Sequence, residues 1–291
     1  MKLTGSMVAL ATPFADGEVD WDALARLVDF QVENGTQGLV PCGTTGESPT
    51  LDNDEHDKVI EFVVERAGGK VPVIAGTGSN STAEAVDRTR HARDAGADAT
   101  LQVNPYYNKP TQQGMHEHMA AVAEVGLPIM LYNIPGRTGI ELAPETIIRM
   151  YDEIEQVVAV KEATGKLDTA SAVAAACDMA IISGDDSMTL GLCAVGGCGV
   201  VSVVANLLPA EVRKLCDAID TGDMSAAREQ HLRLFPLFKG MLSLATNPIP
   251  IKAAMSMAGM LRNELRLPMT RLGEAEQAEL AKMLKPFGIG G

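Results

Sequence analysis

The stretch Val157-Val158-Ala159-Val160-Lys161 decides the fold prediction. Its first four residues are apolar without alternation, which is typical of a strand that is buried on both faces. Side chains alternate along a strand, so Val157, Ala159 and Lys161 are expected on one face. In a closed barrel that face would point inward and bring the lysine to the mouth, because an ammonium group is poorly tolerated beneath surrounding helices.

Seven further apolar runs rich in β-branched residues occur along the chain. They are Val8–Ala11, Gly38–Val40, Val71–Gly76, Ala99–Val103, Pro128–Asn133, Ala180–Ser183 and Gly199–Val204. Helical patterns separate the runs, and eight strands that alternate with helices predict a parallel (β/α)8 TIM barrel. The main alternative is an open doubly wound sheet, which usually carries a Gly-x-Gly-x-x-Gly turn after its first strand. Thr12-Pro13-Phe14 does not fit that turn.

Helix boundaries also have sequence signals. Asp52 with Glu55, and Ser81 with Glu84, have the spacing of a capping box. Pro209 suits the first turn of a helix. The strand runs stop near residue 220, and the rest of the chain shows helical patterns only. We therefore predict a barrel catalytic domain over residues 1–222 and a C-terminal helical domain over residues 223–291.

The composition excludes several classes of partner. The chain has 291 residues and a formal net charge of −14, which opposes binding to nucleic acid or to anionic lipid. Its five cysteines include no Cys-x-x-Cys pair, which favours free thiols in a reducing compartment. No apolar run approaches the roughly 20 residues that span a bilayer, and residues 1–14 lack a signal-peptide core. We expect a cytoplasmic protein without membrane or nucleic-acid partners.

Function in a barrel of this kind lies on the loops that follow the strands. The second strand leads into Gly43-Thr44-Thr45-Gly46-Glu47. Its glycines allow the backbone to approach a ligand closely, and successive N–H groups with two hydroxyls can bind an anion. A plain glycine-rich turn explains the same residues about equally well.

Tyrosines collect in two of these loops. Three of the four tyrosines, Tyr106, Tyr107 and Tyr132, follow the fourth and fifth strands. A phenol there can relay protons, although it can also be a rim aromatic with a solvated hydroxyl. Arg137 could clamp a carboxylate in the same region, but an isolated arginine is more often a surface residue.

The lysine that closes the sixth strand is the sharpest single signal. Partial burial lowers the pKa of an ammonium group, and the free amine is a good nucleophile for a carbonyl carbon. Alternatively, Lys161 reaches solvent from the end of the strand. From the strand alone the two interpretations are comparable.

Metal and phosphate sites are not favoured. His116 and His118 are two residues apart on an expected helix and so face different ways, and no carboxylate cluster accompanies them. Asp185 and Asp186 follow the seventh strand, where their charges would repel a phosphate. Cys42 has no histidine near it in the sequence, so we interpret it as a buried thiol.

Taken together, the motifs resemble the dihydrodipicolinate synthase family, within the wider group of pyruvate aldolases that includes N-acetylneuraminate lyase. The resemblance covers essentially the whole chain. Besides the segments above, it rests on Gly5-Ser6, Ile74-Ala75-Gly76-Thr77-Gly78, Tyr106-Tyr107-Asn108, Tyr132-Asn133, Lys161-Glu162-Ala163-Thr164-Gly165, Ser183-Gly184-Asp185-Asp186 and Asn247-Pro248-Ile249-Pro250. Each motif is weak alone, and the ordered set is strong.

The resemblance implies catalytic roles. Lys161 would form an imine with pyruvate, and Tyr132 would relay protons to and from it. Thr44 would link Tyr132 to Tyr107, which would reach in across a dimer interface. No metal or organic cofactor is implied.

It also implies binding roles. Thr45 would hold the carboxylate of pyruvate, and Arg137 would bind that of the second substrate, L-aspartate 4-semialdehyde. Gly184 and Val203 would complete the substrate site. The product would be 4-hydroxy-tetrahydrodipicolinate, an intermediate of lysine and diaminopimelate biosynthesis. Thr44-Thr45 and Arg137 favour this activity over that of N-acetylneuraminate lyase, and the complete set argues against a silent barrel that only binds a 2-oxo acid.

Finally, family members that L-lysine inhibits imply a regulatory site and a homotetramer built as a dimer of dimers. The corresponding residues here are Ser48, His56, Asn80, Glu84 and Tyr106. Pro49 and Asn53 depart from the sensitive pattern, so we expect weaker inhibition by lysine. Glu84 could instead serve only to cap its helix.

Overall fold

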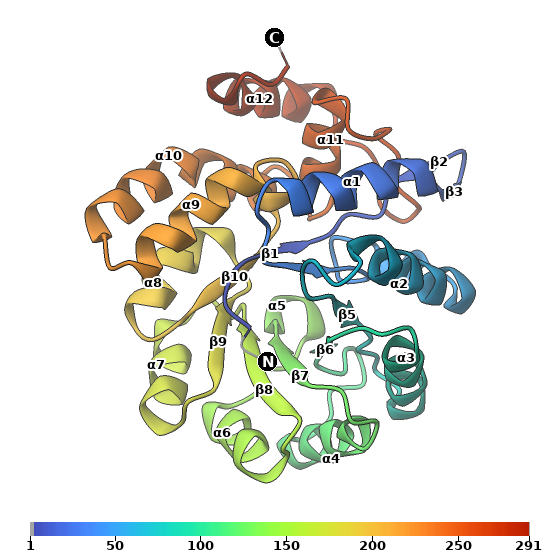
Figure 1. The fold of residues 1–291 in the computed structure, drawn as a ribbon, viewed down its shortest axis with the longest axis vertical. Helices are drawn as coiled ribbons and strands as arrows, with labels where there is room; N and C mark the ends of the chain where they lie inside the picture. Colours follow the sequence, from blue (N-terminus) through green and yellow to red (C-terminus); the bar gives the residue numbers. More distant parts are fainter. Residues whose placement is uncertain (1–2, 291) are drawn as a thin grey trace.

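A closed barrel of eight parallel strands forms the centre of the computed structural model, which describes residues 3–290. The strands are β1 (Gly5–Ala9), β4 (Gly38–Val40), β5 (Ile74–Gly76), β6 (Ala99–Val103), β7 (Ile129–Asn133), β8 (Val157–Glu162), β9 (Ala180–Ser183) and β10 (Gly199–Ser202). A parallel bridge between Leu39 and Val73 closes the ring between β4 and β5. Each strand lies within or overlaps one predicted run, and the predicted fold is confirmed (Figure 1).

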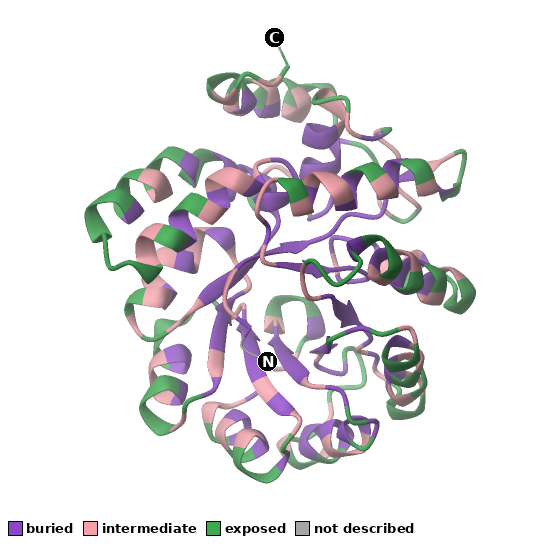
Figure 2. Ribbon diagram, in the orientation of Figure 1, coloured by how far each residue is buried: buried purple, intermediate pink, exposed green. Residues whose placement is uncertain are grey.

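Helices surround the strands. The helices of the barrel are α1 (Trp21–Glu33), α2 (Asn53–Ala67), α3 (Thr82–Asp94), α4 (Gln112–Ala123), α5 (Pro135–Thr138), α6 (Pro144–Glu153), α7 (Leu167–Ala176), α8 (Thr189–Ala194) and α9 (Pro209–Asp220). Figure 2 shows buried strands within a ring of helices whose outer faces are exposed. This arrangement explains why the strand sequences are apolar without alternation.

The predicted helix starts differ in detail. Asp52 and Glu55 form a reciprocal capping box at the start of α2, as predicted. Ser81 caps α3 by accepting a hydrogen bond from the backbone N–H of Glu84. The Glu84 carboxylate does not return that bond, because it is engaged by Ser79 and Arg88. Only half of the second predicted box is therefore formed.

Strand β8 does not alternate as predicted. The register with β7 shifts between Ile129 and Met130, which face Val157 and Ala159. As a result, Val157 packs in the apolar cluster between the strands and the helices, whereas Ala159 packs inside the barrel. The prediction that Val157 shares a face with Lys161 was therefore wrong, because the irregularity adds a residue to the strand.

A short hairpin was not predicted. Strands β2 (Phe14–Ala15) and β3 (Glu18–Val19) pair antiparallel between β1 and α1. Two-residue strands are too short to leave a periodic signal.

Three helices follow the barrel: α10 (Met224–Ser243), α11 (Ile249–Met257) and α12 (Glu274–Leu284). Their buried side chains, among them Leu237 and Ile251, belong to the same apolar cluster as Val8 and Leu39 of the barrel strands. The predicted boundary between residues 222 and 223 falls in the turn between α9 and α10, and the division into two domains stays a prediction. No helix within residues 3–290 is both long and apolar enough to cross a membrane.

Candidate active site

A cavity of about 610 Å³ opens at the carboxyl ends of the barrel strands. Its lining includes Thr44, Tyr132 and Arg137, which the sequence predicted for the site. A larger cavity of about 820 Å³ lies at the opposite end of the barrel, where β8 and β9 begin, and none of the predicted site residues line it. The chemistry therefore points to the smaller cavity, because barrel enzymes act at the carboxyl ends of their strands.

Lys161 lies beside Tyr132, which lines the cavity. Lys161 itself is not among the lining residues, nor are three other predicted residues: Thr45, Gly184 and Val203. Lys161 and Tyr132 are register partners on β8 and β7, and the Lys161 Nζ atom lies 4.0 Å from the centroid of the Tyr132 ring. Lys161 is only 5% exposed. Within the described residues its ammonium group takes part in no hydrogen bond or ion pair at ordinary distances. An amine held in this way is available to a carbonyl carbon.

The ends of β9 and β10 enclose the lysine. A Cβ atom on Gly184 would come within 3.2 Å of Lys161 Cε and 2.7 Å of Ala163 Cβ, so a side chain there would crowd the amine. Val203 is held by Asp186, whose Oδ2 atom accepts hydrogen bonds from the N–H groups of Val203 (2.9 Å) and Val204 (3.2 Å). Burial raises the pKa of the Asp186 carboxyl to about 6.

The loop after β4 carries the two threonines. Thr44 lines the cavity, and Thr45 is buried and receives a hydrogen bond from Asn247 Nδ2 at 3.0 Å. Thr12 donates to the carbonyl oxygen of Gly46 at 2.8 Å. Glu47 ends the loop in the left-handed conformation, with φ of 54°. The loop is thus fixed from both sides before any ligand arrives.

A buried ion pair ties this loop to the C-terminal helices. Lys252 of α11 is fully buried, and its Nζ atom lies 2.6 Å from Glu47 Oε1 and 3.0 Å from the Thr12 carbonyl oxygen. The second oxygen of Glu47 accepts a hydrogen bond from the backbone N–H of Arg266 at 3.1 Å. Neither Lys252 nor Arg266 was predicted, because partners some 200 residues apart leave no local pattern in the sequence.

Arg137 approaches the cavity from α5. Its Nη2 atom donates to the carbonyl oxygen of Asn247 at 2.9 Å. Asn247 therefore contacts both Thr45 and Arg137, the two residues that were predicted to hold carboxylates.

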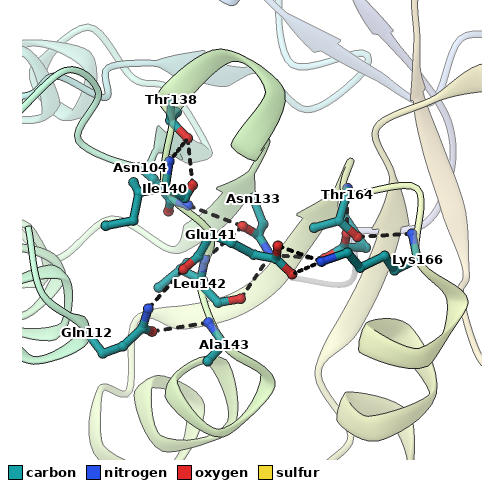
Figure 3. A network of polar contacts seen from close by, with 11 residues as sticks. Asn104, Gln112, Asn133, Thr138, Ile140, Glu141, Leu142, Ala143, Thr164 and Lys166 are labelled. Carbon is teal, nitrogen blue, oxygen red and sulfur yellow. Dashed lines mark hydrogen bonds and ion pairs between the residues drawn. The ribbon is translucent and has the colours of Figure 1, made fainter. Parts of the chain in front are cut away.

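A polar network outside the barrel supports the segment that follows Arg137 (Figure 3). The Asn133 amide exchanges hydrogen bonds with the backbone of Leu142, at 3.0 and 3.2 Å, and donates to Glu162 Oε2 at 3.3 Å. Glu162 also accepts from the N–H of Thr164 at 2.7 Å. Burial raises the pKa of the Glu162 carboxyl. The network fixes the ends of β7 and β8, and with them the positions of Tyr132 and Lys161.

Comparisons with known proteins show the family of this chain. A model of the Dihydrodipicolinate synthetase family matches residues 2–287. The chain belongs to this family. A 4-hydroxy-tetrahydrodipicolinate synthase from Pelobacter propionicus is 50% identical over 98% of this chain and 99% of its own length.

Three solved structures of dihydrodipicolinate synthases are similar as well. The enzyme from Aquifex aeolicus superposes with a TM-score of 0.97 at 48% identity over 99% of both chains. That from Acinetobacter baumannii, complexed with pyruvate, gives 0.96 at 41% identity over 99% of this chain and 100% of its own. That from Cyanidioschyzon merolae, with lysine bound, gives 0.94 at 40% identity over 98% of both chains.

Tyr107 stands apart from the site in this member of the synthase family. It is 90% exposed, has a left-handed backbone with φ of 73°, and does not line the cavity of its own chain. Among residues 3–290, no hydrogen bond joins Thr44 to Tyr132 or to Tyr107. The predicted relay of hydroxyl groups from Tyr132 through Thr44 to Tyr107 therefore stays a prediction.

The residues predicted for lysine binding separate into two groups. Ser48, Glu84 and Tyr106 line the outer part of the cavity. His56 is buried, and its Nε2 atom lies 2.8 Å from the Gly76 carbonyl oxygen; burial lowers the pKa of this imidazole. Asn80 donates to the Tyr106 carbonyl oxygen at 3.1 Å. His56 and Asn80 therefore contact backbone carbonyl groups of residues that line the cavity.

Arg88, which the sequence analysis did not single out, reaches into this group. Its Nη2 atom lies 2.9 Å from Glu84 Oε1 and 3.1 Å from Asn53 Oδ1. Glu84 and Arg88 both line the cavity. The carboxylate that was predicted to receive a ligand ammonium thus already has a cationic partner.

Cys42, His116 and His118 were also considered from the sequence, and their contacts indicate structural roles. Cys42 is buried and burial raises the pKa of its thiol, which makes it a poor nucleophile. His116 lies 3.0 Å from Glu153, whereas His118 lies 2.9 Å from the Thr82 hydroxyl, so the two rings point to different partners. Among residues 3–290, no cluster of three His, Cys, Asp or Glu is arranged for a metal.

Proposed function

We propose that this protein condenses pyruvate with L-aspartate 4-semialdehyde to give 4-hydroxy-tetrahydrodipicolinate, a step of lysine and diaminopimelate biosynthesis. The observation that carries the proposal is Lys161, a buried lysine without an anionic partner beside Tyr132, in a chain of the dihydrodipicolinate synthetase family.

The chemistry begins at Lys161. Its amine attacks the ketone carbon of pyruvate, and loss of water gives a protonated imine. This imine draws electrons, so a methyl proton leaves and an enamine forms. The enamine carbon bonds to the aldehyde carbon of the second substrate. The amine of that substrate then bonds to the imine carbon, the bond from this carbon to Lys161 breaks, and the ring closes.

Hydroxyl groups around the lysine carry out the proton transfers. Tyr132, whose ring lies against the Lys161 ammonium group, is the proposed first relay, and Thr44 is the next group. Tyr107 of the partner subunit completes the relay. The high exposure of Tyr107 on its own chain supports this role, because such a large side chain on a strained backbone suits insertion elsewhere. We propose a homotetramer built as a dimer of dimers.

Substrate binding relies on local donors. Thr45 and neighbouring N–H groups hold the pyruvate carboxylate, Gly184 leaves room beside the amine, and Val203 closes the site. Arg137 binds the carboxylate of the aldehyde. The carboxylates of both substrates need such donors within a protein of net charge −14. The reaction uses no metal and no organic cofactor, and we place it in the cytoplasm.

L-lysine is the proposed inhibitor, bound at Ser48, Glu84 and Tyr106, with His56 and Asn80 behind them. A related structure with lysine bound supports this proposal. The pair formed by Glu84 and Arg88 supports weak inhibition, since a ligand ammonium has to compete with the guanidinium. Pro49 and Asn53 act in the same direction.

Imine trapping with an aldehyde screen tests the activity. Borohydride reduction in the presence of pyruvate is expected to increase the mass of the protein by one reduced pyruvate, located on Lys161. Turnover is expected with aspartate semialdehyde and not with N-acetylmannosamine, the aldehyde partner of N-acetylneuraminate lyase. Trapping without turnover of any aldehyde would instead indicate a barrel that only binds a 2-oxo acid.

A further inference from the structure

Asn247 contacts two of the residues that are proposed to bind the substrates, Thr45 and Arg137. It lies just before α11, lines the cavity, and is 6% exposed. Its Nδ2 atom donates to the hydroxyl oxygen of Thr45 at 3.0 Å, so the Thr45 hydroxyl can in turn donate to a carboxylate. Its backbone carbonyl oxygen holds the guanidinium of Arg137 at 2.9 Å. One residue thus borders the proposed binding places of both substrates.

The remaining side-chain oxygen of Asn247 is unused. Among the described residues, Oδ1 is a buried acceptor without a hydrogen-bond partner. A buried acceptor of this kind is uncommon in a folded protein and suits a ligand donor. The other cavity-lining residue with a buried unpaired polar atom is Arg88, whose Nε is a donor.

The carboxylates of the cavity are already engaged. Glu47 binds Lys252 with one oxygen and the N–H of Arg266 with the other. Glu84 binds Ser79 with one oxygen and Arg88 with the other. The side-chain acceptor that remains free for an incoming cationic group is therefore Asn247 Oδ1.

We propose that Asn247 is a specificity residue that accepts a hydrogen bond from the ammonium group of the amino aldehyde. This inference rests on the proposed function. The substrate is an α-amino acid, so its ammonium group is one carbon away from the carboxylate that Arg137 binds. Within one asparagine, the backbone oxygen and Oδ1 are at most about 5 Å apart. The free acceptor of Asn247 and the backbone oxygen that holds Arg137 therefore belong to one residue, which places Oδ1 near the guanidinium that is proposed to bind the carboxylate.

A neutral acceptor also fits the chemistry that follows. The ammonium has to lose a proton before its nitrogen can bond to the imine carbon and release Lys161. A carboxylate would stabilise the ammonium and raise its pKa, whereas an amide oxygen orients the group with a much smaller effect. An amide at this position therefore combines recognition with ring closure.

The test compares two aldehydes on enzyme already charged with pyruvate. Aspartate semialdehyde carries the ammonium, and succinate semialdehyde is the same chain without it. Borohydride quenching and mass spectrometry give the rate at which each aldehyde consumes the trappable pyruvate imine on Lys161, whether the adduct then stays on the lysine or leaves it by ring closure. We expect Asn247→Ala to lower the ratio of the two second-order rate constants by about tenfold, the value of one charge-assisted hydrogen bond. Asn247→Asp is expected to keep or raise the ratio, because it retains an acceptor.

Thr45→Val is the matched control. It removes the partner of Nδ2 and weakens pyruvate binding, so both aldehydes should be affected equally. Trapping of pyruvate alone verifies that each variant folds and charges. An unchanged ratio in Asn247→Ala, within a factor of two, would overturn the proposal. If the wild-type protein traps pyruvate but forms an adduct with neither aldehyde, the proposed function fails and this inference fails with it.

Discussion

Two buried lysines of this barrel have opposite surroundings. Lys161 and Lys252 are 5% and 0% exposed, and each ammonium lies over an aromatic ring, Tyr132 at 4.0 Å and Phe14 at 4.3 Å. Lys252 is tied to a carboxylate and a carbonyl oxygen. Lys161 has no such partner among the described residues. Burial therefore does not by itself distinguish the lysine that we propose to be reactive from one that is held in an ion pair.

The anionic partner makes the difference. Burial lowers the pKa of Lys252, and the Glu47 carboxylate opposes this effect and keeps the pair together. A lysine held in that way stabilises a loop, and its nitrogen is not free to attack a carbonyl carbon. Substitutions of Lys161, Lys252, Arg137 and Arg88 test this contrast and the sites next to it.

The largest effect is expected for Lys161→Arg. Arginine keeps the charge but is not a nucleophile, so trapping of pyruvate should disappear and turnover should fall by more than about 10³-fold. Thermal unfolding should change little. Mass spectrometry of peptides after borohydride treatment checks the site. Pyruvate reduced onto Lys252 or any other lysine would contradict the assignment.

Lys252→Met is expected to act on stability. It leaves Glu47 as an unpaired buried carboxylate, so the free energy of unfolding should fall by about 3 to 5 kcal/mol. Urea unfolding measures this change. The double variant Lys252→Met with Glu47→Gln removes both charges and should recover part of the loss. A cost below about 1 kcal/mol for the single variant would show that the pair is not structural.

Arg137→Ala should impair use of the aldehyde without impairing the reaction with pyruvate. Imine formation with pyruvate is expected to persist, whereas use of aspartate semialdehyde should weaken by about 2 to 5 kcal/mol, the cost of a lost charge-assisted pair. Steady-state kinetics with varied aldehyde measure the effect. Arg149→Ala is the control, since Arg149 is paired with Glu153 on α6 outside the cavity. An unchanged dependence on aldehyde would rule out the carboxylate clamp.

The smallest effect concerns regulation. Arg88→Leu releases Glu84 from its internal partner, so inhibition by L-lysine should strengthen by up to about fivefold, as expected for one partly exposed ion pair. Arg90→Leu, which alters an exposed pair with Asp87, serves as control. Activity titrated with lysine gives the result, and Glu84→Thr should abolish inhibition. If millimolar lysine inhibits none of these proteins, the Glu84 group is structural only.

The sequence predicted the barrel well because each strand is a continuous apolar run with a helix behind it. Its errors have local causes. The β-bulge at the start of β8 moved Val157 to the outer face, and the two-residue strands β2 and β3 were too short to detect.

The sequence predicted where several candidate site residues lie, and their catalytic and binding roles stay predictions. Lys161, Tyr132 and the Gly43–Glu47 loop lie at strand ends, where position alone marks them. Lys252 and Arg88 were not predicted, because their importance arises from partners that only the fold brings close. Asn247 belongs to one of the motifs that carry the family resemblance, but the sequence assigned it no role.

The bond between Glu47 and Lys252 joins residues 205 positions apart. A ribosome that adds roughly 5 to 20 residues per second needs roughly 10 to 40 s to synthesise that interval. Throughout this time the nascent barrel exposes a carboxylate loop without its cation. The synthesis of α11 is therefore the step that supplies the cation for Glu47, and a chain that ends before Lys252 lacks this contact.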